Sequence, residues 1–508
     1  MAANVYLVGA GPGDPGLITL KGKQCIEDSD VIIYDYLASP ALLNYTHTNA
    51  ELIYVGKKGG DHTLSQDKIN ALIVEKAKAG FTVCRLKGGD PFIFGRGGEE
   101  AEILASKSIP FEIVPGVTSA IAAAAYAGIP LTHRKLTATL AFITGHEDPH
   151  KKESNIDWES LARGIGTLVF FMGIKNLPDI TQKLIANGRS PETPVALIRW
   201  GTTPSQTTVT GTLDSIAEQA KKVDLKPPAI IVVGEVVQLR NTLKWFEKRP
   251  LLGRRIVVTR ARQQASELVR RLSDLGAECL EFPTINVMPA DDLTPLADAV
   301  QNLSIYDWII FTSVNGVKFF FDHLVGTDKD IRALSHLNTA AIGPATAAKL
   351  LEYGLKSDIL PKKYLAEAVV EAFRKISLEG KKILLPRAAE ARPVLPLELR
   401  KMGADVDEVT AYRTKKVRGD TDQLINRLEE KTIDMVTFTS SSTVQNFKAL
   451  LPPDRFKQLI KGATIASIGP ITTGTAIESG FEVAITAKSY TIPGLCDAIV
   501  KFYRNKKV

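Results

Sequence analysis

The sequence predicts an α/β protein with largely parallel sheets, divided into more than one domain. Short apolar runs, such as "VYLVGA" at 5–10 and "RIVVTRA" at 255–261, alternate with patterns of helical period throughout the chain. The chain has 508 residues, too many for one core, so two to four domains are expected. The second half also repeats itself, which predicts two similar lobes there.

The composition is typical of a soluble globular protein, with 44% hydrophobic and 23% charged residues. A net charge of +7 suits an anionic ligand or simply a solvated surface. The chain has no basic run or heptad pattern that would predict binding to nucleic acid. The longest run of small residues, "AIAAAAYAGIPL", is too short to span a bilayer. The N-terminus passes straight into a strand, so we expect neither a signal peptide nor a membrane partner.

The cysteines and histidines indicate reduced thiols and no metal site. The four cysteines are scattered singly and show no C-x-x-C spacing, which favours buried thiols in the reducing cytoplasm. The seven histidines show no spacing typical of metal ligands. We therefore expect a cytoplasmic protein without a metal cofactor.

The stretch "GPGDPG" at 11–16 follows a strand and matches the G-x-G-x-x-G pattern of a dinucleotide site. Asp35 stands about twenty residues on, where that pattern places an acid. Asp14 and Pro15 argue against an NAD site, because an Asp-Pro pair is typical of an N-cap and the first helical position. The Asp14 carboxylate would then repel a pyrophosphate. If Thr19 caps the helix instead, the glycine loop is detached from the helix start.

A second glycine loop, "RLKGGDPFIFGRGGEE" at 85–100, follows another strand. Gly88 and Gly89 permit close backbone approach, and five glycines are too costly in chain entropy for a plain connection. This favours a ligand loop. Asp90 and Pro91 again read as an N-cap and first helical position. Farther on, "TLVFFMG" predicts a buried strand ending at Met172, where core filling is the simplest role for the methionine.

The second half contains two copies of one pattern. "FTSVNGVKFF" recurs as "FTSSSTVQNF", and the offset from Phe311 to Phe438 is 127 residues. "AIGPATAAKLLEYG" recurs as "SIGPITTGTAIESG". The "FTS" and "IGP" turns each end a strand and open a helix, so their amide groups and hydroxyls either bind anions or only cap the helices. A cleft between the two lobes is the expected ligand site.

The two halves meet at "KWFEKRPLLGRR", residues 244–255, where charges, a proline and a glycine predict an exposed linker. We expect the first domain at 1–246, the linker at 247–253 and the second domain at 254–508.

The first half resembles the uroporphyrinogen-III C-methyltransferases of the tetrapyrrole methylase family over residues 4–246. The resemblance rests on "VGAGPGDPGLITLKG", "VIIYDYLAS", "VGKKGG", "RLKGGDPFIFGRGGEE", "PGVTSA", "GIPLTHR", "TGH", "FFMG" and "PPAIIVVGEVV", in that order. It implies two α/β subdomains with S-adenosylmethionine in the cleft between them, usually in a homodimer, and it favours this cofactor over NAD.

The resemblance also implies roles for individual residues. Asp35 and Lys57 take the positions assigned to proton transfer. The cofactor is expected to contact Pro12, Gly88, Gly89, Asp90, Ile93, Thr118, Ser119, Met172 and Gly201.

The second half resembles the uroporphyrinogen-III synthases, through "DWIIFTSVNGVKFF", "AIGPATAAKL", "VTAYRT", "MVTFTSSSTVQNF" and "SIGPITTGTAIESG". It implies two lobes, about 254–283 with 416–508 and 288–411, joined by a ladder of "EFPTINV" with "EVTAYRT". Tyr412 matches a tyrosine thought to aid loss of the substrate hydroxyl. Carboxylate-binding candidates are Thr312, Ser313, Thr439 and Ser440.

Together the resemblances imply a bifunctional enzyme of sirohaem- and cobalamin-type tetrapyrrole biosynthesis. The second half would cyclise hydroxymethylbilane to uroporphyrinogen III, and the first half would methylate that product twice to precorrin-2. Two alternatives stay open: an NAD-dependent oxidoreductase, and a methyltransferase fused to a non-catalytic, two-lobed anion-binding domain.

Overall fold

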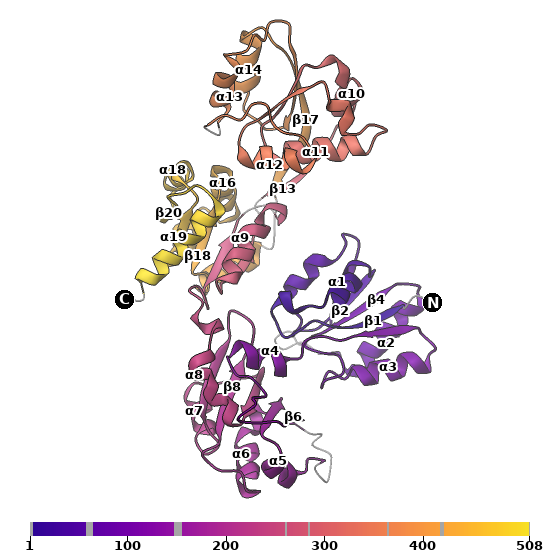
Figure 1. Cartoon of the computed structure of the whole chain (residues 1–508), viewed down its shortest axis with the longest axis vertical. Coiled ribbons are helices and arrows are strands. Elements are labelled where there is room, and N and C mark those ends of the chain that lie inside the picture. The colour runs from indigo at the N-terminus through magenta and orange to yellow at the C-terminus, as the bar shows by residue number, and fades with distance from the viewer. Residues whose placement is uncertain are drawn as a thin grey trace. The chain divides into compact units, whose positions relative to one another are not determined.

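The computed structural model describes residues 4–56, 64–146, 155–259, 262–282, 285–362, 365–416 and 421–506. Its strands form four five-stranded sheets, two in each half of the chain (Figure 1). Contacts divide the chain into two compact units, one of residues 1–254 with 272–278 and 503–508, the other of 255–271 with 279–502. The predicted α/β class is confirmed, and so are the two α/β subdomains of the first half and the two α/β lobes of the second. In the described part of the chain, no helix has both the length and the apolarity that crossing a membrane requires.

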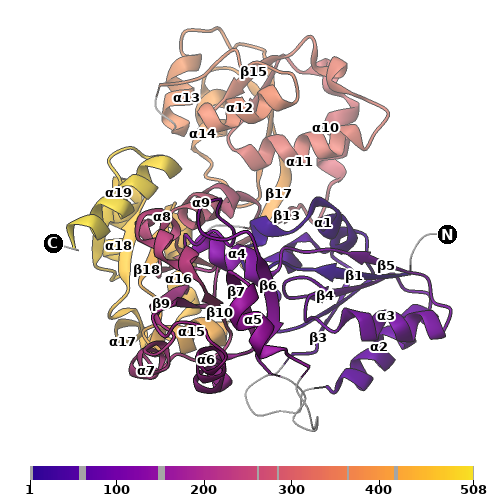
Figure 2. The ribbon, with the colours of Figure 1, turned by 60° about the horizontal axis from the view of Figure 1, so that its bottom comes forward.

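The first subdomain is a parallel sheet of strand order β3-β2-β4-β1-β5. Figure 2 shows α1 on one face of this sheet and α2 and α3 on the other. Because all strands run the same way, their carboxyl ends share one edge, and the loops that follow β1, β2 and β4 emerge there together. The elements are β1 (Val5–Gly9), η1 (Pro15–Leu17), α1 (Leu20–Glu27), β2 (Val31–Tyr34), η2 (Pro40–Tyr45), β3 (Glu51–Tyr54), α2 (Gln66–Lys78), β4 (Val83–Lys87), α3 (Gly97–Ser106) and β5 (Phe111–Val114).

The second subdomain has a mixed sheet of order β6-β7-β10-β8-β9. Only β6 and β7 pair in parallel, whereas β10 pairs antiparallel with β7 and β8, and β8 with β9. The expectation of largely parallel sheets is therefore wrong here, because the short connection from β8 to β9 permits only an antiparallel pair. The elements are α4 (Ser119–Tyr126), β6 (Leu140–Thr144), α5 (Trp158–Gly164), β7 (Thr167–Phe171), η3 (Ile174–Asn176), α6 (Leu177–Ala186), β8 (Pro194–Arg199), β9 (Thr207–Thr212), α7 (Ile216–Lys222), β10 (Ala229–Val233), η4 (Glu235–Leu239), α8 (Arg240–Leu243) and η5 (Phe246–Lys248).

Helix α4 joins the two subdomains. It begins shortly after β5 of the first sheet, but its buried alanines pack against strands β7, β8 and β10 of the second. Ala120 and Ala124 are fully buried, and their small side chains let the helix lie close to the sheet. The alanine-rich run therefore fixes where the first subdomain ends and the second begins.

The segment between the two halves is less exposed than its charges suggest. Leu251 is fully buried, and its amide donates to the carbonyl of Leu275 at 3.0 Å. Phe246 is 2% exposed. The expectation of an exposed linker is wrong at these apolar positions, because burying each side chain stabilises the segment more than solvating it.

The second half contains one sheet in each lobe. The first lobe has the order β12-β11-β18-β19-β20, with core residues such as Phe438 and Phe447. Its elements are β11 (Arg255–Val258), α9 (Arg262–Asp274), β12 (Glu278–Glu281), α15 (Thr421–Glu429), β18 (Met435–Phe438), α16 (Ser441–Leu450), α17 (Phe456–Ile460), β19 (Thr464–Ser467), α18 (Pro470–Glu478), β20 (Val483–Thr486) and α19 (Ile492–Asn505).

The second lobe has the order β13-β17-β16-β14-β15. Strand β13 pairs antiparallel with the far end of β17, with Val287 opposite Thr414 and Pro289 opposite Tyr412. Its elements are β13 (Ile285–Pro289), α10 (Thr294–Gln301), η6 (Leu303–Ile305), β14 (Trp308–Phe311), α11 (Val314–Val325), η7 (Ile331–Leu334), β15 (Asn338–Ala341), α12 (Pro344–Glu352), α13 (Ala366–Phe373), β16 (Lys382–Ala388), α14 (Val394–Lys401) and β17 (Asp405–Lys416).

Candidate functional site

A cavity of about 680 Å³ in the first half is lined by residues of both subdomains. It lies at the carboxyl edge of the parallel sheet, where the loops after β1 and β4 emerge. All nine residues expected to contact a cofactor line this one cavity, although they are spread over most of the first half of the sequence. They are Pro12, Gly88, Gly89, Asp90, Ile93, Thr118, Ser119, Met172 and Gly201.

The two glycine loops are hydrogen-bonded to each other at the cavity. The Gly11 amide donates to the Gly89 carbonyl at 3.1 Å, and the Gly89 amide donates back to Gly11 at 2.8 Å. Both glycines have positive φ, +73° each. Only residues without a side chain adopt this backbone readily, so the pair explains why glycine stands at these two positions.

Asp14 caps the short helix η1, as its position before Pro15 predicts. Its Oδ1 accepts a hydrogen bond from the Gly16 amide at 2.8 Å, and its Oδ2 accepts one from the Tyr126 hydroxyl at 2.7 Å. Thr19 separately caps α1 by accepting from the Gly22 amide. Both proposed caps are therefore present, on successive helices. A carboxylate occupies the first helix start, which removes the anion site that an NAD pyrophosphate would need.

Asp90 does not start a helix, so that expectation is wrong. Its Oδ1 accepts hydrogen bonds from the amides of Phe92 and Ile93, at 2.8 and 3.1 Å, and its Oδ2 accepts one from Gly116 at 3.0 Å. Helix α3 begins only at Gly97, whose amide donates to the Pro91 carbonyl at 2.9 Å. Both carboxylate oxygens accept hydrogen bonds that hold the loop folded back, and this loop conformation replaces the helical turn.

Met172 is not a core residue, which corrects the simplest interpretation of its strand. It follows the end of β7, is 54% exposed and has a φ of +55°. Phe94 and Trp200 also line the cavity with positive φ, +52° and +49°. Left-handed backbone is costly for residues with side chains and concentrates at functional sites. The three side chains are thus held at the cavity by strained backbone.

Asp35 lies beside the cavity wall. It follows β2, and the next residues, Tyr36 and Leu37, line the cavity. Its Oδ2 accepts a hydrogen bond from Nη2 of Arg85 at 3.3 Å, and its Oδ1 accepts one from the Leu37 amide at 3.1 Å. The side chain is 27% exposed. Lys57, expected to share the proton transfer, lies outside the described residues.

Sequence reasoning missed a buried charge cluster next to Asp35. Arg85 and Lys87 of β4 and Glu100 of α3 are each at most 4% exposed in their side chains. Burial and the neighbouring guanidinium of Arg85 hold the pKa of Lys87 below its usual range. Two cations on alternate positions of an otherwise apolar strand were the available signal, since charges are rarely buried unless paired.

Tyr412 is the best-placed candidate in the second half. Its hydroxyl lies 2.9 Å from Oγ of Ser313, and its ring stacks on Phe319 with centroids 5.7 Å apart. The side chain is buried, and this burial raises the pKa of Tyr412 although the Ser313 hydrogen bond partly lowers it. The phenol therefore stays protonated. The structure brings together two residues expected on separate grounds, a tyrosine predicted to be catalytic and a serine predicted to bind a carboxylate.

The "FTS" turns cap helices in both lobes. Ser313 accepts from the Gly316 amide at the start of α11, and Ser440 forms a reciprocal capping box with Thr443 at the start of α16. Thr312 and Thr439 are half-buried beside these caps. Capping is thus one function of the two serines.

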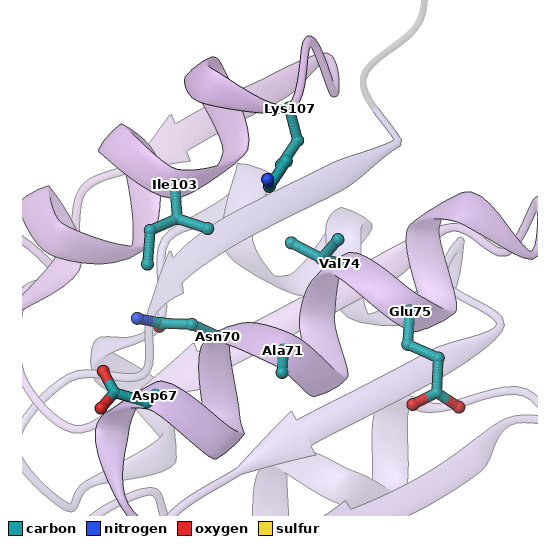
Figure 3. Close-up of a pocket in the computed structure, with 7 residues that line it drawn as sticks. All are labelled: Asp67, Asn70, Ala71, Val74, Glu75, Ile103 and Lys107. Carbon is teal, nitrogen blue, oxygen red and sulfur yellow. The ribbon is translucent and has the colours of Figure 1, made fainter.

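A second hollow lies between α2 and α3, with Val74 and Ile103 pointing into the gap between the helices (Figure 3). None of the residues expected to carry chemistry lines it. Among the described side chains, no group of three or more His, Cys, Asp and Glu could hold a metal ion.

Comparisons with known proteins match both halves. Residues 4–217 match the family of Tetrapyrrole (Corrin/Porphyrin) Methylases, and residues 266–497 match Uroporphyrinogen-III synthase HemD. The chain is 38% identical to the Porphyrin biosynthesis protein HemD of Ruminiclostridium josui, over 98% of this chain and 97% of that one.

The first half alone has close relatives too. It is 54% identical to the S-adenosyl-L-methionine-dependent uroporphyrinogen III methyltransferase of Methanosarcina barkeri, over 47% of this chain and 94% of that one. A crystal structure of uroporphyrin-III C-methyl transferase from Thermus thermophilus with S-adenyl homocysteine is 40% identical, covers 46% of this chain and 99% of that chain, and has a TM-score of 0.40. The chain belongs to both families and fuses a tetrapyrrole methylase to a uroporphyrinogen-III synthase in one polypeptide.

Proposed function

We propose that this chain carries out two consecutive steps of tetrapyrrole biosynthesis. The second half cyclises hydroxymethylbilane to uroporphyrinogen III with inversion of the last ring. The first half methylates uroporphyrinogen III twice with S-adenosylmethionine to give precorrin-2. The observation that carries the proposal is the convergence of nine residues, chosen from sequence motifs, on one cavity between two subdomains.

The cavity fits S-adenosylmethionine in size and in lining. Its volume of about 680 Å³ lies within the roughly 300–1,000 Å³ typical of small-molecule sites. A Cβ at Gly89 would meet no atom closer than 3.9 Å, so the missing side chain leaves open space rather than tight packing. When bound, S-adenosylmethionine supplies an electrophilic methyl group on a sulfonium centre. Pro12, Gly88 and Thr118 are among the residues proposed to hold it.

The methylation needs orientation and one proton transfer. A pyrrole carbon of the substrate forms the new bond to the methyl group, so the enzyme must chiefly align the two reactants. The macrocycle must later lose a proton, and we assign its removal to Asp35, with Lys57 as its partner in the proton transfer. The Arg85 hydrogen bond holds the Asp35 carboxylate in one orientation, next to the lining residues Tyr36 and Leu37.

In the second half, we assign loss of the substrate hydroxyl to Tyr412. A phenol with a raised pKa stays protonated at neutral pH and can donate a proton to the leaving hydroxyl. Ser313 holds the phenol oxygen at 2.9 Å. The substrate carboxylates are proposed to bind at the two helix starts, through Thr312, Ser313, Thr439 and Ser440.

Parallel incubations, one with hydroxymethylbilane and one with added uroporphyrinogen III, test the two activities. The full chain is given hydroxymethylbilane and labelled S-adenosylmethionine, and the tetrapyrrole products are analysed. Doubly labelled precorrin-2 is the expected result. If the chain methylates added uroporphyrinogen III but forms none from hydroxymethylbilane, the second half is a binding domain. If neither substrate is converted and a nicotinamide cofactor copurifies, the NAD alternative holds.

We further propose that the chain works in the cytoplasm as a homodimer formed by its first half, without a metal. Light scattering of the full chain and of residues 1–248 tests the dimer, since both should show twice the monomer mass. A metal analysis of active protein tests the last point.

A further inference from the structure

Glu100 is a fully buried anion between two buried cations. Its Oε1 accepts hydrogen bonds from Nε of Arg85 at 3.2 Å and from Nζ of Lys87 at 2.7 Å. Gln66 of α2 donates a third, at 3.1 Å. Taking such charges out of water is costly, and removing one partner leaves the others uncompensated. The cluster therefore needs a reason beyond stability.

From Glu100, one branch of contacts leads to the proposed base. Arg85 donates through Nε to Glu100 and through Nη2 to Asp35, at 3.3 Å. Its Nη1 donates to the carbonyl of Leu86 at 3.0 Å. The planar guanidinium is thus held on three sides, and its direction toward Asp35 depends on the Glu100 carboxylate.

The other branch leads to the cofactor loops. Lys87 directly precedes Gly88, and its carbonyl accepts the Ala10 amide at 2.7 Å, just before the first glycine loop. Glu100 lies in α3, the helix that follows the second glycine loop. The ion pair of Lys87 with Glu100 therefore ties together the two ends of the loop that carries Gly88 and Ile93.

The cluster also reaches the helix pair drawn in Figure 3. Gln66 of α2 donates to Glu100 of α3 and also to Asn70 at 3.0 Å, and Asn70 lines the hollow between the two helices (Figure 3). Among the described buried atoms, Oε2 of Glu100 has no hydrogen-bond partner.

We propose that Glu100 is a positioning residue for methyl transfer, acting on Asp35 through Arg85 and on the cofactor loop through Lys87. The inference rests on the proposed function of the first half. Its two branches predict two separable effects, one on turnover and one on cofactor affinity. Variants of Arg85 and of Lys87 should each show only one of the two effects, which a cluster that merely stabilises the fold would not produce.

The test compares four variants of the full chain, with two readouts. Calorimetric titration with S-adenosylhomocysteine reports cofactor affinity, and kcat at saturating S-adenosylmethionine with uroporphyrinogen III reports turnover. Arg85→Met should lower kcat about 100-fold, as misplacing a reacting group does, without changing the affinity. Lys87→Met should weaken binding about tenfold, as loss of one buried hydrogen bond does, without changing kcat.

Glu100→Gln should produce both effects, and Glu102→Gln, an exposed carboxylate on the same helix, should produce neither. If Glu100→Gln matches the Glu102 control in both readouts while the wild-type chain is active, the inference is overturned. If the wild-type chain itself fails to methylate, the proposed function has failed instead. If Glu100→Gln does not fold, it is replaced by the double variant with Lys87→Met and Glu100→Gln, which removes one cation and one anion together. That pair should show both effects, and unchanged affinity and kcat in it would equally overturn the inference.

Discussion

The Tyr126 hydroxyl donates a hydrogen bond to Oδ2 of Asp14, 2.7 Å away. Asp14 belongs to the first glycine loop, whereas Tyr126 ends α4, the helix that packs on the sheet of the second subdomain. The Asp14 amide donates to Thr202 of the second subdomain at 3.0 Å. These bonds span the two subdomains that enclose the cavity, so the cavity's shape depends on them.

Removing the Tyr126 hydroxyl is expected to loosen the cavity. Tyr126→Phe leaves the ring against Trp245 and Phe246 but deprives Asp14 of its donor. We expect a loss of about 1–3 kcal/mol in the free energy of unfolding and weaker binding of S-adenosylhomocysteine. Urea unfolding and calorimetric titration measure the two effects. Unchanged affinity would show that the loop is held by other contacts.

The same variant has a predicted pH signature. Burial and the hydrogen bond to Asp14 raise the pKa of Tyr126 in the folded chain. Its stabilising effect is therefore complete below the unfolded pKa of about 10 and is lost as the pH rises toward the folded pKa. Between pH 9 and 11, wild type should lose more stability than Tyr126→Phe. Parallel curves would contradict this account.

Asp35→Asn is expected to impair methyl transfer and to leave ring closure unchanged. The amide keeps the size of the side chain but cannot accept the proton, and a general base contributes about 10²–10⁴-fold. Product analysis with each substrate separately measures the two activities. Asp67→Asn, an exposed carboxylate on α2, is the control and should methylate normally. Normal methylation by Asp35→Asn would exclude Asp35 as the base.

Tyr412→Phe is expected to slow cyclisation of hydroxymethylbilane without loss of fold. The variant keeps the stacking on Phe319 but removes the hydroxyl that contacts Ser313. The matched control is Tyr306→Phe in the same lobe, a buried tyrosine whose hydroxyl donates to Asp407 at 2.7 Å. Tyr306→Phe should lower the free energy of unfolding but leave the rate of cyclisation unchanged. Equal rates in wild type and Tyr412→Phe would move the role to other groups.

The sequence predicted the parts of the site that depend on backbone shape. Gly11 and Gly89 have positive φ where the two loops bond to each other, and a Cβ at Gly88 would clash with Cβ of Leu37, so the glycine motifs alone located these positions. For Met172 the strand pattern alone predicted core filling, because strand periodicity predicts burial but not the left-handed residue that ends this strand, and only the family resemblance predicted a place at the cofactor. Asp90 was wrongly predicted to cap a helix because Asp-Pro caps and Asp-Pro loops share a local pattern and differ only in distant partners such as Gly116.

The Glu100 cluster was missed for a related reason. Arg85 and Lys87 lie on one strand, and their shared anion comes from a helix that follows the intervening loop. The way the helix packs on the sheet decides which charged side chains pair across such a loop, and the spacing of these residues in the sequence does not show it. The antiparallel part of the second sheet was missed because strand direction depends on connection length, which short apolar runs do not encode.

The last prediction concerns separating the two halves. A cut after Lys248 should give two fragments that fold and work separately, because each half has its own sheets and its own core clusters. Residues 1–248 keep Phe246 against Tyr126, and residues 249–508 keep Leu251 bonded to Leu275. A cut after Gly253 should destabilise the second fragment, since it removes the fully buried Leu251 at a cost of about 2–5 kcal/mol, as for a large buried side chain. Denaturant unfolding of the two versions of the second fragment measures this difference.

Mixed fragments 1–248 and 249–508 should still convert hydroxymethylbilane to dimethylated product, with a longer lag than the intact chain. Inactivity of either fragment alone, restored by adding the other, would mean that the halves share a core.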